Sequence, residues 1–408
     1  MAANPIPDNR IDPSAAYLVG GARTPVGRYG GALSGVRADD LAALVVGEAV
    51  TRAGLAPDLI DEVILGAANQ AGDDNRNVAR MAVLLAGLPE HIPGMTVNRL
   101  CASGLSAVIL AAQMIRAGDA DAVIAGGVES MSRAPWVQEK PTRAYAKPGE
   151  IADTSIGWRF VNPRLIARRN TTLSMPETAE EVARICAISR ADADAFALES
   201  QRRAGRALAA GSFDAEIVSV PTRSGPVSID EAPRPETTAE GLAGLRPVVP
   251  GGNVVTAGNA SSLNDGASAL LVVSGALVLS QGLTPRARVV SQATVGVAPE
   301  TMGLGPIPAT RRALERAGLT VQDLGAIELN EAFATQSLAC IRELGLDPER
   351  VNALGGAIAL GHPLGSSGSR LVITLLGRLE REGERFGLAT MCVGVGQGSA
   401  LIIERIQA

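Results

Sequence analysis

The sequence predicts an α/β fold made of two similar halves, with a smaller unit inserted into the first. Three observations lead to this prediction: strand-like and helix-like segments alternate along the chain, the alternation occurs twice, and the offset between its two copies breaks once. Alternation of this kind is typical of α/β proteins. The 408 residues are enough for one large or two ordinary domains with a sizeable core.

The first half begins with a predicted strand at 17–23 and an amphipathic helix at 40–53. A second strand at 62–66 reads EVILG. The segment 100–118 has apolar residues at helical spacing and ends on a glycine, as helices often do. A continuous apolar run at 122–128 is typical of a strand buried on both faces.

The C-terminal third repeats this order of elements. A strand at 287–296 and a helix at 308–318 are followed by the strand AIEL at 326–329, a long helix at 366–383 and a strand at 388–394. The strand at 326 follows its counterpart at 62 by 264 residues, and the later elements keep nearly the same offset. A fixed offset carried through several elements indicates a duplicated domain.

The repeat is interrupted inside the first half. SALLV at 268–272 resembles SALII at 399–403, but these two segments are only 131 residues apart. An insertion of about 133 residues in the first half explains the difference. We therefore expect a first half of residues 1–133 and 262–284, an inserted loop domain of residues 134–261, and a second half of residues 285–408.

Composition excludes several classes of protein. The net charge is −5 and aromatic residues make up 2%, so the chain has neither the basic field nor the stacking side chains of a nucleic-acid-binding protein. The four cysteines form no CxxC pair, which argues against a metal site or a disulfide framework. Neither a charged leader followed by an apolar segment in residues 1–17 nor an apolar run near 18 residues is present, so we expect a cytoplasmic protein without membrane contact.

Cys101 and His362 are the first candidates for chemistry. Cys101 stands where the helix of 100–118 begins, and free N–H groups at a helix start lower the pKa of a thiol. An unpaired cysteine can equally be a small buried core residue. His362 lies in a glycine-rich turn that opens the long helix of the second half, at a position that corresponds to residue 98 of the first. Two such turns brought together would place an imidazole beside a thiol, although a loop histidine can also serve a backbone carbonyl.

Cys392 and Asn330 both end predicted buried strands. Cys392 precedes alternating glycines in CVGVGQG, where a thiol could exchange a proton with a ligand; a buried structural cysteine is the alternative. A dinucleotide-binding loop is excluded because no helix follows these glycines. Asn330 in ELNEAFA closes the strand at 326–329, where its amide could hold a water or an oxyanion, or only form a turn. Glu331 could orient a neighbouring group.

The other scarce residues read as structural. Cys186 and Cys340 lie on apolar helical stripes and are expected in the core, and His91 is expected at the surface. Two arginine clusters remain. The first cluster, Arg202, Arg203 and Arg206, is expected on a solvent-exposed helix face. The second could lie on the surface or could bind a phosphate or carboxylate, and it comprises Arg159, Arg164, Arg168 and Arg169.

Taken together, the motifs resemble those of the thiolases, which are acyl-CoA C-acyltransferases. The motifs, in chain order, are NRLCASGL, GGVESMSRAPW, VTAGNASSLNDGAS, NEAFA, GGAIALGHPLGSSGSR and CVGVGQG. The resemblance covers nearly the whole chain. It implies two βαβαβαββ halves in a five-layer α/β/α/β/α core with a loop domain inserted in the first half.

The resemblance also implies roles for individual residues. Cys101 corresponds to the acylated nucleophile, Cys392 to a second thiol that moves protons, and His362 to the base that activates Cys101. Asn330 corresponds to the residue that holds a water for the thioester oxygen. The backbone N–H groups of Cys101 and Gly394 correspond to a second oxyanion hole, for tetrahedral intermediates.

In the inserted domain the resemblance implies a coenzyme A groove and an acyl pocket. Arg234, Ala257 and Ser261 match positions along the groove, and Met175 matches a wall of the acyl pocket. Coenzyme A is then a substrate, with no permanently bound cofactor and no metal. Members of the family are homodimers or homotetramers, so we expect one of these assemblies.

Among thiolases, the segments NQAGDDNRNVARMAVLLAGLP, TSIGWRFVNP and SMPETAE most resemble degradative 3-oxoadipyl-CoA (β-ketoadipyl-CoA) thiolases of aromatic-compound catabolism. Ser174 occupies the place of a histidine in biosynthetic thiolases, which disfavours an acetoacetyl-CoA-specific enzyme. A broad short-chain acetyl-CoA acetyltransferase remains the alternative. Cys392 argues against a decarboxylating condensing enzyme, and the complete set of four candidate side chains argues against a non-catalytic acyl-CoA-binding protein. We expect one arginine of the Arg159–Arg169 cluster to pair with the distal carboxylate of the substrate.

Overall fold

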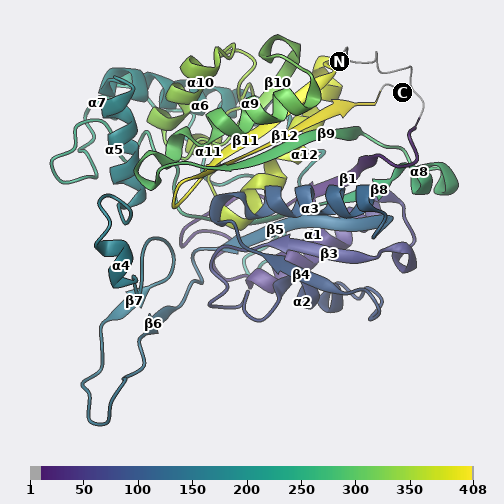
Figure 1. The fold of residues 1–408 in the computed structure, drawn as a ribbon, viewed down its shortest axis with the longest axis horizontal. Coiled ribbons are helices and arrows are strands. Elements are labelled where there is room, and N and C mark those ends of the chain that lie inside the picture. The colour runs from purple at the N-terminus through teal and green to yellow at the C-terminus, as the bar shows by residue number, and fades with distance from the viewer. Residues whose placement is uncertain (1–10, 407–408) are drawn as a thin grey trace.

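The computed structural model describes residues 11–406, and its strands and helices form five stacked layers (Figure 1). The strands of the first half are ordered β4-β3-β5-β8-β1 and those of the second half β9-β12-β11-β10. The first set comprises β1 (Ala16–Arg23), β3 (Glu62–Gly66), β4 (Gly94–Val97), β5 (Ala122–Ser130) and β8 (Asn264–Ser274), with the short β2 (Gly27–Arg28) beside β8. The second set comprises β9 (Ala287–Gly296), β10 (Leu324–Leu329), β11 (Phe386–Val393) and β12 (Gln397–Arg405).

Both halves use the same pairing pattern, which confirms the predicted duplication. In the first half β1 and β5 both run antiparallel to β8, and β3 runs parallel to β5. In the second half β9 and β11 both run antiparallel to β12, and β10 runs parallel to β11. The two sets are joined where Tyr17 pairs with Arg288 and Leu18 with Ala287. The first half closes only when the chain returns at Asn264 after the insertion, and the domain boundaries given above remain our proposal.

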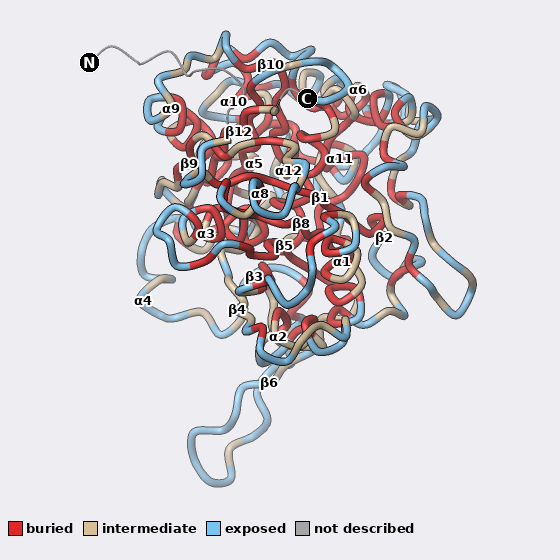
Figure 2. Tube along the Cα trace, turned by 90° about the vertical axis from the view of Figure 1, so that its right-hand side faces the viewer, coloured by how far each residue is buried: buried red, intermediate tan, exposed pale blue. Residues whose placement is uncertain are grey.

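Six helices form the three helical layers. The outer layer of the first half consists of α1 (Ala38–Ala53) and α2 (Val78–Leu85), and that of the second half of α9 (Pro306–Ala317) and α10 (Ala334–Leu344). The central layer consists of α3 (Ser103–Ala117) and α12 (Leu364–Glu382), whose apolar residues pack against strands of both halves. Each sheet is therefore covered on both faces, and most core residues lie between layers (Figure 2).

The segment that contains α3 corrects the expectation that no apolar run of the chain approaches 18 residues. Leu100–Ala117 is an 18-residue segment with a mean hydropathy of 1.6, long and apolar enough by composition to span a membrane. Of its residues, 61% are buried inside the protein. The apolar character is explained by its position, because this helix faces protein on several sides between the two sheets.

Glycines allow the N-terminal ends of α3 and α12 to meet. A Cβ at Gly104 would lie 2.6 Å from the carbonyl oxygen of Gly365, and one at Gly127 would overlap with the same oxygen. A side chain at Gly104 would push α12 away from α3, and one at Gly127 would push it away from β5. The close approach brings the turns before both helices to one place in the fold.

The insertion forms an arm and a helical cap. The arm is a hairpin of β6 (Trp136–Gln138) and β7 (Ile151–Asp153) that projects from the core (Figures 1 and 2). The helices of the insertion are α4 (Pro163–Ile166), α5 (Met175–Ile185), α6 (Arg190–Ala209) and α7 (Ala239–Ala243). Two short helices lie outside it: α11 (Ala357–Leu360) of the second half packs against α6, and α8 (Gly275–Gln281) follows β8.

On α6, the expected solvated arginine face is only partly correct. Arg202 and Arg206 are exposed, but Arg203 is buried. Its guanidinium donates to the backbone oxygens of Pro348 and Val351 at 3.0 and 2.7 Å. Arg203 thus fastens the inserted domain to the second half.

Candidate active site

Cys101 lies in a short 3-10 turn, η2 (Leu100–Ala102), directly before α3. The preceding residue, Leu100, has a φ of 47°, a left-handed conformation that is uncommon for a leucine. Asn98 holds this turn by accepting the N–H of Leu100 at 2.8 Å, and the Ser103 hydroxyl accepts the N–H of Arg99 at 2.9 Å. Local hydrogen bonds therefore hold the thiol at the start of the central helix.

The pKa of the Cys101 thiol is raised to about 11, which corrects the expectation that a helix start lowers it. Burial is the largest cause, because the protein surrounds the sulfur even though the residue is partly accessible. The charge of Glu129 acts in the same direction. Hydrogen bonding from the backbone N–H groups of Gly394 and of Cys101 itself lowers the pKa, but not enough to offset burial. The resting thiol is therefore protonated at neutral pH.

Gly394 approaches Cys101 from the turn between β11 and β12. A Cβ at position 394 would lie 3.1 Å from Cδ1 of Leu100 and 3.5 Å from the sulfur of Met175, so a side chain there would crowd both. The next residue, Val395, has a φ of 62°, which is strained for a β-branched residue. Left-handed residues thus flank both backbone N–H groups that point at the thiol, one from each half of the molecule.

His362 is buried in the turn before α12 and is held there through its backbone N–H and its Nδ1. Its backbone N–H donates to Oδ1 of Asn264 at 2.8 Å, and its Nδ1 lies 2.6 Å from the hydroxyl of Ser367. The Ser367 hydroxyl also donates to the carbonyl oxygen of Pro363 at 2.9 Å, so its oxygen is left to accept a proton from Nδ1. We assign the neutral Nδ1–H tautomer on this basis, which leaves a lone pair on Nε2.

Burial lowers the pKa of His362 to about 3, and the positive charge of Arg370 adds to the effect. The imidazole is therefore neutral at physiological pH. A neutral imidazole has a lone pair on Nε2 that can accept a proton.

Asn330 follows β10 and meets His362 at Nε2. The amide Nδ2 of Asn330 lies 3.3 Å from Nε2 of His362, while its backbone N–H donates to the carbonyl oxygen of Thr390 at 3.0 Å. Its Oδ1 is buried and makes no hydrogen bond within residues 11–406. A buried amide oxygen without a partner is costly, so it points to a missing polar group such as a water or a substrate atom.

Cys392 lies near the end of β11, two residues beyond Thr390, and is completely buried. Burial raises the pKa of its thiol well above the usual value, and the neighbouring charges of Cys101 and Cys340 raise it further. It packs in an apolar cluster with Ala332, Phe333 and Met175. Cys101 thus lies close enough to raise the pKa of Cys392 although the two thiols belong to opposite halves.

The site residues form two linked groups in the resting structure. One contains the thiols of Cys101 and Cys392 with the N–H of Gly394, and the other contains His362 and Asn330. Within the described chain, no hydrogen bond joins Cys101 to His362. The strand pair of β10 and β11 connects the groups, because Asn330 and Cys392 follow paired positions of these strands.

The predicted coenzyme A residues lie at the surface of the inserted domain. Arg234 and Ala257 are exposed, and Ser261 is half-buried. Arg234 forms no ion pair with an acidic residue in the part of the chain that the structure describes, so its charge is available to a ligand. Ser261 reaches the NEAF loop, where its N–H donates to the carbonyl oxygen of Ala332 at 3.0 Å.

Sequence reasoning missed two residues that support the site. Ser367 orients His362 through its hydroxyl. The sequence offered one signal for this residue: Ser367 follows His362 by five residues in GHPLGSS, so the first turn of the helix brings it back beside the histidine. Glu129 is buried and accepts the N–H groups of Ala68, Asn69 and Gly365 at 3.0, 3.1 and 2.8 Å. It joins the loop after β3 to the first turn of α12, a long-range contact that no local pattern indicates.

Other predictions had mixed outcomes. Glu331 does not orient a reacting group; it accepts hydrogen bonds from Ser200 and Asn352 and anchors α11 through the N–H of Ile358. Cys340 is buried and His91 is exposed, as expected, whereas Cys186 is only half-buried at the end of α5. No cluster of three or more potential metal ligands occurs in residues 11–406.

Five layers around a duplicated core, with two thiols, a histidine and an asparagine between the halves, define the thiolase class of acyltransferases. Residues 16–276 match the thiolase N-terminal domain and residues 283–405 the thiolase C-terminal domain. The chain therefore belongs to the thiolase family.

Individual relatives agree with this assignment. The chain is 57% identical to a beta-ketoadipyl-CoA thiolase of Escherichia coli over 96% of this chain and 99% of the relative. It is equally similar, over the same shares, to a beta-ketoadipyl-CoA thiolase of Pseudomonas aeruginosa. Among solved structures, human mitochondrial 3-ketoacyl-CoA thiolase in complex with CoA superposes with a TM-score of 0.90 at 38% identity, over 98% of this chain and 100% of the other.

Proposed function

We propose that this thiolase cleaves 3-oxoadipyl-CoA with coenzyme A to give acetyl-CoA and succinyl-CoA, through an acyl intermediate on Cys101. The observation that carries the chemistry is the convergence of the backbone N–H groups of Gly394 and Cys101 on the Cys101 thiol. The substrate is supported by the names of relatives that are 57% identical over nearly their full lengths.

In the first half-reaction, the Cys101 sulfur attacks the C3 carbonyl carbon and its proton passes to Nε2 of His362. The N–H groups of Cys101 and Gly394 stabilise the oxyanion formed at C3. When the C2–C3 bond breaks, its electron pair leaves as the enolate of acetyl-CoA, and Cys392 protonates C2. Removing one donor from an oxyanion hole typically raises a barrier by about 3–4 kcal/mol.

In the second half-reaction, coenzyme A replaces acetyl-CoA. Its thiol gives a proton to the Cys392 thiolate and attacks the acyl carbon on Cys101. The Cys101 sulfur then leaves and recovers its proton from His362, which returns every group to its resting state. Two thiols suit this exchange because attacking and leaving groups have similar basicity.

His362 and Asn330 are suited to hold the enolate oxygen. The amide of Asn330 lies beside Nε2 of His362, and its own Oδ1 is an unused acceptor for a water that could donate to that oxygen. Once His362 has taken the Cys101 proton, Nε2–H also becomes a donor. Electrostatic stabilisation by preorganised donors in a dry site is commonly the largest contribution to catalysis.

Coenzyme A enters this proposal as a substrate that lies along the inserted domain. Arg234 offers an exposed positive charge for a phosphate, and Ala257 and Ser261 line the path toward the NEAF loop. Met175, packed beside Cys392, forms one wall of the acyl pocket. The assembly we propose is a homodimer or homotetramer in the cytoplasm; the arm, which exposes Trp136 and Ile151, is an apolar surface of the kind that subunits cover.

Thiolysis rates over acetoacetyl-CoA, 3-oxohexanoyl-CoA and 3-oxoadipyl-CoA test the function. We expect the largest kcat/KM for 3-oxoadipyl-CoA and no activity in Cys101→Ala. Equal rates, or a preference for acetoacetyl-CoA, would instead identify a broad short-chain acetyltransferase. Ser174 serves as the N-cap of α5 in a capping box with Glu177.

A further inference from the structure

We propose that Arg159 binds the distal carboxylate of the acyl chain and so determines the preference for a dicarboxylic substrate. This inference rests on the proposed function. It concerns the free carboxylate of the succinyl group that remains on Cys101, which two methylene groups separate from the acyl carbon. A carboxylate moved into a protein pocket needs a charged or hydrogen-bonding partner, and arginine can bind it through two parallel hydrogen bonds.

The structure separates Arg159 from the other arginines of its cluster. Arg164, Arg168 and Arg169 are all exposed on and after α4. Arg159 is half-buried and its Nη2 donates to Oδ1 of Asn69 at 3.1 Å. A hydrogen bond of this kind fixes the guanidinium plane, which lowers the entropy lost when a ligand binds.

The charge of Arg159 is not used by the protein itself. No aspartate or glutamate oxygen lies within 4.0 Å of it in residues 11–406, whereas most buried arginines of this chain form ion pairs. Its remaining donors likewise have no partner there apart from Asn69. A fixed guanidinium with free donors is the feature that distinguishes this residue from a structural arginine.

Hydrogen bonds connect the Arg159 loop to both walls of the proposed acyl pocket. On one side, Asn69 is adjacent to Ala68, whose carbonyl oxygen accepts Nδ2 of Asn98 at 2.9 Å in the segment that leads to Cys101. On the other side, Nε1 of Trp158 donates at 3.3 Å to the carbonyl oxygen of Leu173, two residues before Met175. The loop that carries Arg159 is therefore linked by hydrogen bonds to the segment that precedes Cys101 and to the segment that precedes Met175.

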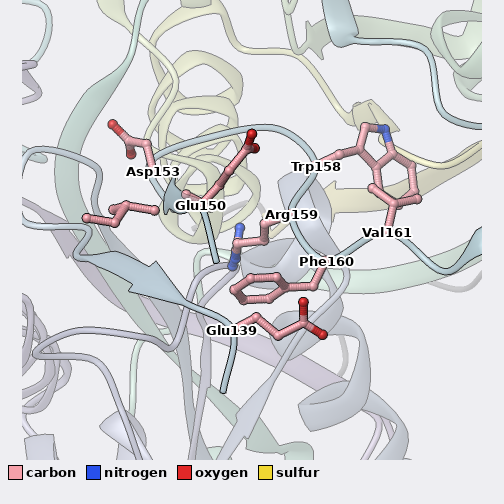
Figure 3. A pocket seen from close by; sticks show the side chains of 9 residues that line it. Glu139, Glu150, Asp153, Trp158, Arg159, Phe160 and Val161 are labelled. Atoms are coloured by element: carbon pink, nitrogen blue, oxygen red, sulfur yellow. The ribbon is translucent and has the colours of Figure 1, made fainter. Parts of the chain in front are cut away.

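Arg159 also lines a hollow of about 510 Å³ between this loop and the arm (Figure 3). Trp158 and Phe160 lie beside it, and Phe160 has a φ of 49°, a strained conformation of the sort found at ligand-binding loops. Three acidic residues, Glu139, Glu150 and Asp153, line the same hollow. They repel an anion that enters through this hollow, so the proposal requires the carboxylate to reach Arg159 from the side of Asn69.

The test compares two substrates of equal chain length. 3-Oxoadipyl-CoA and 3-oxohexanoyl-CoA differ only in a carboxylate that replaces the terminal methyl. The variants are Arg159→Met, which removes the charge and keeps much of the length, Arg159→Lys, which keeps the charge and loses the paired donors, and the matched control Arg164→Met on the exposed part of the cluster.

We expect Arg159→Met to lower kcat/KM for 3-oxoadipyl-CoA by about 10- to 100-fold, the usual effect of losing a charged hydrogen bond, with little change for 3-oxohexanoyl-CoA. Arg159→Lys should lie between this variant and the wild type, and Arg164→Met should change neither substrate more than about twofold. Equal losses with both substrates would mean a structural role and would overturn the inference, as would an unchanged preference. A wild type with no preference for 3-oxoadipyl-CoA would overturn the proposed function itself.

Discussion

The backbone N–H of Gly394 lies against the thiol of Cys101, although the two residues belong to opposite halves of a duplicated fold. The contact depends on the absence of a side chain at Gly394, where a Cβ would crowd Leu100 and Met175. Leu100, before Cys101, and Val395, after Gly394, both have left-handed backbone conformations. These conformations direct the N–H groups of Cys101 and Gly394 toward the thiol. Backbone strain of this kind persists only where the surrounding structure holds it.

The pKa of Cys101 predicts how the free enzyme reacts with alkylating agents. Because burial raises this pKa to about 11, the thiolate fraction, and with it the rate of alkylation by iodoacetamide, should increase steadily from pH 7 to pH 10. The rate at Cys101 is measured by peptide mass spectrometry, with loss of thiolysis activity in parallel. A plateau near neutral pH would show a preformed thiolate and contradict the resting state described here.

Replacing Asn330 with alanine should lower kcat by about 10²- to 10³-fold, because it removes the amide that lies beside Nε2 of His362. KM should change little, since the amide acts on charge that develops during the reaction. Steady-state thiolysis gives both constants, and thermal unfolding checks the fold. A variant with a raised KM and an unchanged kcat would place Asn330 in substrate binding instead.

Ser367→Ala tests whether His362 needs its orientation. Loss of the 2.6 Å contact with Nδ1 should reduce kcat by about 3- to 10-fold, the effect of one hydrogen bond. The matched control is Ser369→Ala, since Ser369 is equally buried on α12 but bonds to Ser268 rather than His362. Similar losses in both variants would indicate general disturbance of the helix and not a specific effect on the imidazole.

Glu129 predicts a pH dependence of stability. Burial raises the pKa of this carboxyl to about 7 from a model-peptide value of 4.5, so between these values the folded state binds more protons than the unfolded state. The contribution of Glu129 to the free energy of unfolding should therefore fall as pH rises from 4.5 to 7. In Glu129→Gln, urea unfolding across this range should lack that fall relative to the wild type. Parallel curves for the two proteins would refute the raised pKa.

Much of the fold was predictable because both copies of the duplicated domain contain short apolar strands that can be recognised from local sequence. The boundaries of β3 at Glu62–Gly66 and β9 at Ala287–Gly296 agree with the prediction residue for residue, since each is a short run ended by glycine. The expectation that no apolar segment approaches 18 residues was wrong for Leu100–Ala117, because a helix packed between two sheets carries apolar residues on several sides. Arg203 was misjudged because its acceptors, the oxygens of Pro348 and Val351, lie about 150 residues away in the chain.

The places of the four candidate residues in the fold were predictable from the sequence, but the pKa shifts of their side chains were not. Cys101, His362, Asn330 and Cys392 each stand at the end of a strand or the start of a helix, which is a local signal. The raised pKa of Cys101 and the lowered pKa of His362 depend on how completely the two halves close over the site. Glu129 escaped notice for the same reason, because its partners come from two distant segments, residues 68–69 and Gly365.

The most direct test of the account is the acyl-enzyme itself. The protein is mixed with 3-oxoadipyl-CoA without added coenzyme A, quenched in acid and analysed by intact and peptide mass spectrometry. We predict one succinyl group per chain, on Cys101, and none in Cys101→Ala. Absence of the adduct, or its appearance on Cys392 or another residue, would contradict the central claim that Cys101 is the nucleophile of a 3-oxoadipyl-CoA thiolase.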